Sequence, residues 1–251
     1  MSVRVRALVE YDGTDYAGFQ WQPDRPTIQG EIETVLRQLT GEEIRVIGAG
    51  RTDAGVHALG QVIAFDTHWR HSLDELQRGM NALLPRSIAV REMEEAPARF
   101  HPRYDARSRL YRYRILQQPV RSPLQERYAY HVSRQLDVEA MRQATQILVG
   151  THDFATFGQP TQGESTIRHV YHVTWQNEWV RYFGNAWHIW MDIEANAFLR
   201  YMVRSIVGTA LEVGYGVMTL EEFAERFHGR DRSLSAPPAP PQGLCLVAVY
   251  Y

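Results

Sequence analysis

Gly48-Ala49-Gly50-Arg51-Thr52-Asp53-Ala54-Gly55 is a segment with three glycines that lies between two short apolar runs. This much glycine is typical of a loop, because glycine weakens the interior of helices and strands. The glycine spacing fits neither a dinucleotide-binding loop nor a P-loop, which would continue with Lys and Ser or Thr. The loop instead presents an aspartate beside Ala54-Gly55. An aspartate in that position often forms an Asx turn, so the residue type alone leaves a structural and a chemical role open.

Strand and helix patterns alternate on both sides of this loop. A two-residue period over 3–9 and apolar runs over 44–47, 61–65 and 88–93 predict strands. Helical spacing predicts two helices, one opened by Thr27 and closed by Gly41, the other opened by a capping box from Ser72 to Glu75.

The second half of the chain repeats this alternation loosely. We expect strands over 107–116, 168–175, 187–193 and 243–250, helices over 137–149 and 198–213, and a proline-rich extended connector over 233–242. Helices interspersed with paired strands favour an α+β fold built from two similar sheet-and-helix halves. We place these halves at residues 1–105 and 106–251.

Composition excludes several classes of protein. The chain has 251 residues, 44% of them hydrophobic, and no apolar run near the roughly 20 residues that span a bilayer. The first residues show no secretory signal, so we expect a cytoplasmic protein. Cys245 is the only cysteine, which excludes an intrachain disulfide and a cysteine-based zinc site. The histidines form no recognisable metal motif, and we expect no metal.

Arginines and aromatic residues cluster between residues 99 and 114, a stretch we call the arginine-rich segment. It holds six arginines against the single acid Asp105, although the whole chain has a net charge of −2 and no lysine. Guanidinium groups on phosphates and rings under unstacked bases are typical of RNA recognition. A solvated pair of basic strands explains the same pattern, so both interpretations stay open.

Arg200 and Arg204 are four residues apart in the expected helix over 198–213, which would put them on one face. Buried unpaired guanidinium groups are costly, so we expect at least one of the two to meet a carboxylate or a phosphate. A solvent-facing arginine stripe is the alternative.

Together these segments resemble the tRNA pseudouridine synthase A family, whose signature loop matches residues 50–58. Agreement continues in order over nearly the whole chain, in 11–22, 81–85, 100–103, 111–113, 150–154, 196–199, 202–208 and 241–244. Arg200 departs from the family pattern, in which an apolar or aromatic residue is expected.

The resemblance implies a pseudouridine synthase fold, with two halves joined around a central, mostly antiparallel sheet and an active-site cleft between them. It implies a homodimer without cofactor or metal that isomerises uridine to pseudouridine at positions 38 to 40 of the tRNA anticodon arm.

The resemblance also assigns roles to four residues. Asp53 matches the nucleophile, and Arg204 matches its basic partner, which would keep the carboxylate ionised by lowering its pKa. Tyr111 matches a tyrosine that stacks on the target base. Arg51 matches the residue that fills the gap left by a base taken out of its stem. Attack at C6, attack at C1′ and a glycal route all remain open.

Two other classes of function remain. A non-catalytic RNA-binding protein of paired RRM-like halves would explain the arginine-rich segment but gives no role to Asp53. A carboxylate hydrolase would use Asp53 but normally needs a second acid or a bound cation.

Overall fold

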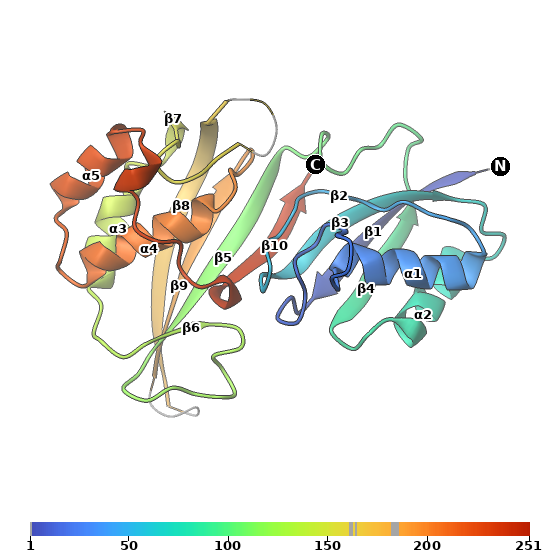
Figure 1. The fold of residues 1–251 in the computed structure, drawn as a ribbon, viewed down its shortest axis with the longest axis horizontal. Coiled ribbons are helices and arrows are strands. Elements are labelled where there is room, and N and C mark those ends of the chain that lie inside the picture. Colours follow the sequence, from blue (N-terminus) through green and yellow to red (C-terminus); the bar gives the residue numbers. More distant parts are fainter. Residues whose placement is uncertain (1, 161–162, 164, 182–185) are drawn as a thin grey trace. The chain divides into compact units, whose positions relative to one another are not determined.

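A computed structural model describes residues 2–160, 163, 165–181 and 186–251. The chain divides into two compact units, drawn in Figure 1: Met1–Arg107 with Cys245–Tyr251, and Ser108–Leu244. The strand at 244–250 thus belongs with the first unit, whereas the division at 105/106 expected from the sequence had assigned it to the second half. In the first unit this strand pairs with the strand at 57–67.

The first unit is built on a sheet whose strand order is β4-β1-β3-β10, with the two-residue β2 also paired to β3. Its strands are β1 (Val3–Tyr11), β2 (Ile47–Gly48), β3 (His57–Thr67), β4 (Ile88–Glu95) and β10 (Leu244–Tyr250). These strands pair antiparallel, except that β10 runs parallel to β3.

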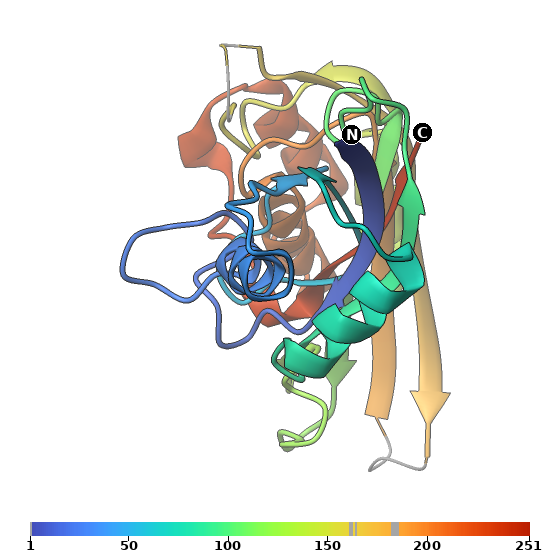
Figure 2. The same ribbon diagram turned by 90° about the vertical axis from the view of Figure 1, so that its right-hand side faces the viewer.

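Two amphipathic helices, α1 (Ile28–Thr40) and α2 (Leu73–Leu83), lie against this sheet, as Figures 1 and 2 show. Their ends follow the sequence signals: the Thr27 side chain accepts from the N–H of Gly30, and Gly41 ends α1 with φ 73°. Ser72 and Glu75 form the expected capping box.

The second unit is built on a sheet of order β5-β9-β8-β7, with β6 paired to β5. Its strands are β5 (Ser108–Gln117), β6 (Tyr130–Val132), β7 (Gly150–Asp153), β8 (Ile167–Val180) and β9 (Ala186–Ala195). The β5–β6 pairing is parallel and the others are antiparallel.

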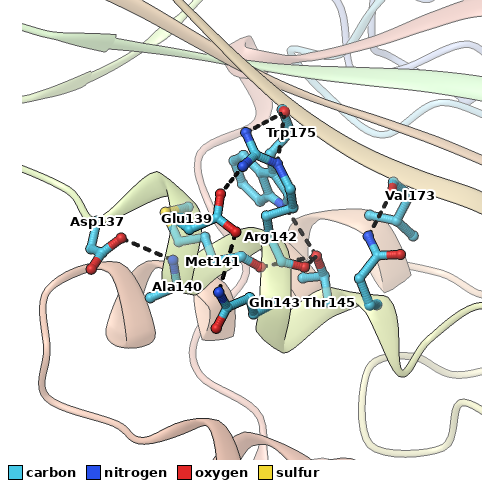
Figure 3. A network of polar contacts seen from close by, with 10 residues as sticks. Asp137, Glu139, Ala140, Met141, Arg142, Gln143, Thr145, Val173 and Trp175 are labelled. Carbon is cyan, nitrogen blue, oxygen red and sulfur yellow. Dashed lines mark hydrogen bonds and ion pairs between the residues drawn. The ribbon is translucent and has the colours of Figure 1, made fainter.

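Three helices accompany this sheet: α3 (Val138–Gln146), α4 (Met202–Gly214) and α5 (Leu220–His228), with 3-10 turns at Arg232–Leu234 and Pro241–Gly243. Polar contacts fix α3 to β8, as Figure 3 shows: Arg142 donates to the carbonyl of Trp175, and the indole N–H of Trp175 donates to Thr145 Oγ1 at 3.1 Å. The helical layer is therefore held to the sheet by hydrogen bonds as well as by apolar packing.

The predicted α+β class is confirmed. Each unit combines a mostly antiparallel sheet with amphipathic helices, and each carries a parallel pairing.

Candidate active site

Asp53 lies on a short loop between β2 and β3. The loop closes with a turn in which the N–H of Val56 donates to the carbonyl of Asp53 at 3.1 Å. Gly55 has φ 76° at the third position of this turn, a conformation that side chains rarely adopt, so glycine is required there. The turn leaves Asp53 half-exposed and the side chain of Arg51 exposed.

Thr52, between these two residues, is buried and held from two sides. Its hydroxyl lies 2.8 Å from the hydroxyl of Tyr11, and its carbonyl accepts from the N–H of Phe19 at 3.1 Å. The amide of Gln61 donates to the carbonyl of Gly50 at 2.9 Å. The backbone on both sides of Arg51 is therefore fixed, although its guanidinium is exposed.

The loop after β1 wraps closely around this turn because it contains glycine at two contact points. A Cβ on Gly13 would lie 2.0 Å from the carbonyl oxygen of Val56, and one on Gly18 would lie 2.6 Å from that of Thr52. Gly13 also donates its N–H to Nδ1 of His57 at 3.1 Å. The segment 11–19 thus forms the back wall of the loop that carries Asp53, residues 49–56, which is the candidate catalytic loop.

Tyr111 lies on β5 in the second unit, with its side chain buried. Its ring meets Phe198 edge to face, with centroids 5.0 Å apart and planes at 83°. Tyr113, two residues on and therefore on the same face of the strand, donates its hydroxyl to the carbonyl of Pro240 at 2.8 Å. Burial raises the pKa of the Tyr113 hydroxyl well above its ordinary value, so this group is a neutral donor.

Arg204 is in the first turn of α4. Its Nε–H donates to the carbonyl of Ala239 at 2.7 Å, and its guanidinium carbon lies 5.4 Å from the ring centre of Tyr201. Gly208, one turn further along α4, makes room for the connector, because a Cβ there would lie 2.2 Å from the carbonyl oxygen of Pro237. The proline-rich connector thus orients the arginine.

Arg200 is not on this helix, which corrects the expectation that it shares a helical face with Arg204. α4 begins only at Met202, because Tyr201 has φ 64° and the backbone of Arg200 pairs with Gln159. The guanidinium of Arg200 instead lies over the ring of Tyr201 at 4.8 Å.

The arginine-rich segment does not form one cationic surface. Arg107 is exposed, but Arg109 is buried and donates to the carbonyl of Asn196 at 2.8 Å. Arg112 makes two hydrogen bonds of 2.7 Å with the carboxylate of Asp192. At least two of the six arginines therefore have partners within the second unit.

A family model described as tRNA pseudouridine synthase matches residues 7–105 and 144–251 of the chain. The chain belongs to this family. The matched ranges contain Arg51, Asp53 and Arg204, whereas Tyr111 lies between them.

Relatives in this family align with nearly the whole chain, and each is named tRNA pseudouridine synthase A. The protein of Brevibacillus brevis is 45% identical over 99% of this chain and 99% of its own length. That of Chloroflexus aurantiacus is 44% identical, covering 98% and 88%, and that of a Geobacter species is 43% identical, covering 98% of both.

The sequence patterns had not singled out the residues that hold the loop: Tyr11, Gln61 and the two glycines of the back wall. The pattern of residues 11–26 indicates a polar, aromatic loop, and residues 11–22 match the family, but neither assigns a role to these particular side chains. The paired glycines at 13 and 18 were the available signal, since close backbone approach is a common reason for glycine in such a segment.

Two properties of the described residues bear on other kinds of function. They contain no group of three or more His, Cys, Asp or Glu side chains arranged to hold a metal ion. None of their helices has the length and apolar character needed to cross a bilayer.

Proposed function

We propose that this chain isomerises uridine to pseudouridine at positions 38 to 40 of the tRNA anticodon arm, with Asp53 as nucleophile. The observation that carries the proposal is the half-exposed carboxylate of Asp53 on a turn fixed from behind, in a chain of the tRNA pseudouridine synthase family.

A carboxylate suits this reaction because it forms a covalent bond that is later broken again. The isomerisation breaks the bond from N1 to C1′ of the ribose and makes one from C5 to C1′. The C5 proton is lost and N1 gains one, so substrate and product have the same atoms and the same oxidation level. The proposal therefore includes no cofactor and no metal. Addition of Asp53 at C6 or at C1′, or a glycal route, all satisfy this balance.

We assign Arg204 as the basic partner of Asp53. A fixed guanidinium favours the ionised form of a nearby carboxylate and restricts its orientation. The bond from Arg204 to Ala239 supports this assignment, because it limits the directions that the guanidinium can take.

Tyr111 and Arg51 are assigned to the RNA. Tyr111 stacks on the target base, and its edge contact with Phe198 supports this role by fixing the plane of the ring. Arg51 fills the space left in the stem, and its exposed side chain on a fixed backbone is suited to insertion. Unstacking a base costs a few kcal/mol, so a residue that props the gap lowers the barrier to flipping.

We further propose that the enzyme is a cytoplasmic homodimer. These two assignments, like the choice of positions 38 to 40, rest on resemblance to the family. Sedimentation equilibrium of the purified protein tests the oligomeric state independently of activity.

The decisive experiment compares the unmodified protein with Asp53→Asn. Each is incubated with anticodon-arm RNA carrying a single uridine at position 38, 39 or 40, or at a stem position outside this range. Digested RNA is analysed by liquid chromatography and mass spectrometry, and RNA affinity is measured in parallel. We expect product from the unmodified protein at 38 to 40 only, and none from Asp53→Asn at unchanged affinity.

Other outcomes would assign other functions. Binding without product in both proteins would favour a non-catalytic RNA-binding protein. A hydrolysis product in place of pseudouridine, lost in EDTA on a stem-loop that folds without divalent cations, would favour a metal-dependent hydrolase. Pseudouridine formed by Asp53→Asn would remove Asp53 from the nucleophile role.

A further inference from the structure

Gln61 is a completely buried amide beneath the catalytic loop. It lies on β3 with no exposed surface, and its Nε2 is 2.9 Å from the carbonyl oxygen of Gly50 and 3.5 Å from the hydroxyl of Tyr11. That hydroxyl in turn lies 2.8 Å from the hydroxyl of Thr52. One connected set of buried polar groups thus reaches the residues on both sides of Arg51.

A β-bulge brings Gln61 and Tyr11 to this position. Val9 on β1 pairs with Gln61 on β3, but Tyr11 pairs with Ala58, so β3 has one more residue than β1 in this interval. Bulges of this kind redirect side chains and often occur beside active sites. The extra residue lies where β3 leaves the catalytic loop.

The amide orientation follows from its neighbour. The carbonyl of Gly50 can only accept, so the nitrogen of the Gln61 amide must face it, and the amide oxygen then points away. Among the described residues this buried oxygen has no hydrogen-bond partner. A buried polar atom without a partner is unfavourable, so an apolar side chain of similar volume would suit the core better. The stability of the core therefore does not explain a glutamine at position 61. The hydrogen bond from its amide to the carbonyl of Gly50 does.

We propose that Gln61 and Tyr11 are positioning residues that hold the segment 50–53 so that Asp53 and Arg51 are correctly directed. Neither side chain touches the substrate. The inference rests on the proposed role of Asp53 as nucleophile, and extends it to the buried residues that fix the nucleophile from behind.

The proposal predicts loss of turnover with little loss of RNA affinity. An ångström of displacement at a reacting group costs about 100-fold in rate. RNA binding depends on many contacts away from the loop, so its dissociation constant is expected to change by less than about 3-fold, which is small beside the contribution of the phosphate contacts.

Tyr11→Phe removes one hydroxyl and has a matched control. Tyr16, in the same wrapping segment, also pairs its hydroxyl with another hydroxyl at 2.8 Å, but its partner is Ser87, which is not part of the loop. We expect Tyr11→Phe to lower kcat about 10-fold or more at unchanged KM. Tyr16→Phe is expected to lose similar thermal stability and to keep kcat.

Gln61→Glu provides a second test, the pH dependence of kcat, which would not change if Gln61 had a purely structural role. In its protonated form the introduced carboxyl donates to the Gly50 carbonyl as the glutamine amide does. In its ionised form it repels that carbonyl, and burial raises the pKa of such a carboxyl. The ratio of the variant's kcat to that of the unmodified protein should therefore be highest at low pH and fall as pH rises through the raised pKa. Taking the ratio removes the titration of Asp53, which both proteins share.

Thr67→Val is the matched control for the variants of Gln61. Thr67 lies on the same strand and is equally buried, but its hydroxyl bonds to Glu42 at 2.9 Å, away from the loop. It should lower the melting temperature with no effect on kcat and no pH-dependent ratio.

The outcomes separate this inference from the proposed function. Product formed by Asp53→Asn would overturn the role of Asp53. With Asp53→Asn inactive, unchanged kcat in Tyr11→Phe would overturn the positioning role alone, whether or not the Gln61 variants fold. A rise in the KM of Tyr11→Phe with unchanged kcat would also overturn the positioning role. So would a fall in the kcat of Tyr16→Phe equal to that of Tyr11→Phe.

Discussion

Arg204 and Ala239 hold each other by two reciprocal hydrogen bonds. The Nε–H of Arg204 donates to the carbonyl of Ala239 at 2.7 Å, and the N–H of Ala239 donates to the carbonyl of Arg204 at 2.9 Å. The side chain and the backbone carbonyl of Arg204 are thereby both fixed to one residue of the connector. Only arginine offers a planar group with a donor at Nε and further donors beyond it.

Arg204→Lys keeps the charge but loses this fixed geometry, so we expect kcat to fall roughly 100-fold, as for a misplaced reacting group. Arg204→Ala should also move the acidic limb of the pH–kcat profile to higher pH. Under the proposed pairing the ionised carboxylate of Asp53 is the reactive form, and loss of its proposed cationic partner would favour protonation of that carboxylate. Single-turnover rates between pH 5 and pH 9 measure both effects. An unmoved acidic limb would refute the pairing.

Tyr111→Ala should remove base stacking, which contributes about 1–3 kcal/mol per base, or roughly 5- to 150-fold in kcat/KM. Tyr111→Phe keeps the ring and its contact with Phe198, so KM should be retained. A loss in Tyr111→Phe as large as that in Tyr111→Ala would contradict a stacking role.

Gly13→Ala would place a methyl group 2.0 Å from the carbonyl oxygen of Val56, so the backbone must shift. We expect a loss of about 1–3 kcal/mol in the free energy of unfolding, as for other overpacked sites. Gly50→Ala is the control for stability, because a Cβ there meets nothing within 4 Å. Urea denaturation of the two variants measures the difference. Equal midpoints would show that the segment 11–19 shifts to accept the methyl group without loss of free energy of unfolding.

Stability should depend on pH through His188 on β9. Burial lowers the pKa of His188 and outweighs the opposing effect of Glu178, Arg114 lowers it further, and Nε2 of His188 has no partner among the described residues. The unfolded chain therefore binds a proton more readily than the folded one, so stability is present above the ordinary histidine pKa and declines as pH falls below it. His188→Gln should reduce the drop in melting temperature between pH 7 and pH 5. An identical drop in both proteins would exclude this histidine as a source.

Helix ends with strong capping signals could be predicted from the sequence. α1 and α2 begin after Thr27 and Ser72 as expected, because the capping side chains satisfy backbone donors locally. The same signal was available for α5, which the sequence analysis had not predicted: Thr219 and Glu222 form a capping box at its start. The local sequence was therefore sufficient to predict the start of α5.

Elements that depend on distant partners could not be predicted in the same way. Residues 44–46 read as a strand, yet β2 is only Ile47–Gly48. The N–H of Val46 donates to Glu33 and its carbonyl accepts from Gln29, so side chains of α1 take the hydrogen bonds that a sheet would have supplied. The late start of α4 likewise depends on Gln159, some forty residues upstream of Tyr201.

The candidate site also contains residues that could be predicted from the sequence and contacts that could not. Residue types and the family resemblance singled out Arg51, Asp53, Tyr111 and Arg204, and the family itself is confirmed. The buried contacts that hold the loop were not predicted, because they depend on a β-bulge and on the closeness of segments far apart in sequence. The charge pattern of the arginine-rich segment gave no sign that Arg112 pairs with Asp192, eighty residues away.

The parallel pairing of β10 with β3 sets an order for biosynthesis. A ribosome makes β10 only after residues 108–243, so the sheet lacks its strand beside His57 and Ala58 while the second unit emerges. Domains otherwise tend to fold as they leave the exit tunnel, N-terminal first. Here the nascent chain cannot complete the sheet from which the Asp53 loop extends until β10 is translated, so this loop gains its full support only after both units have been synthesised.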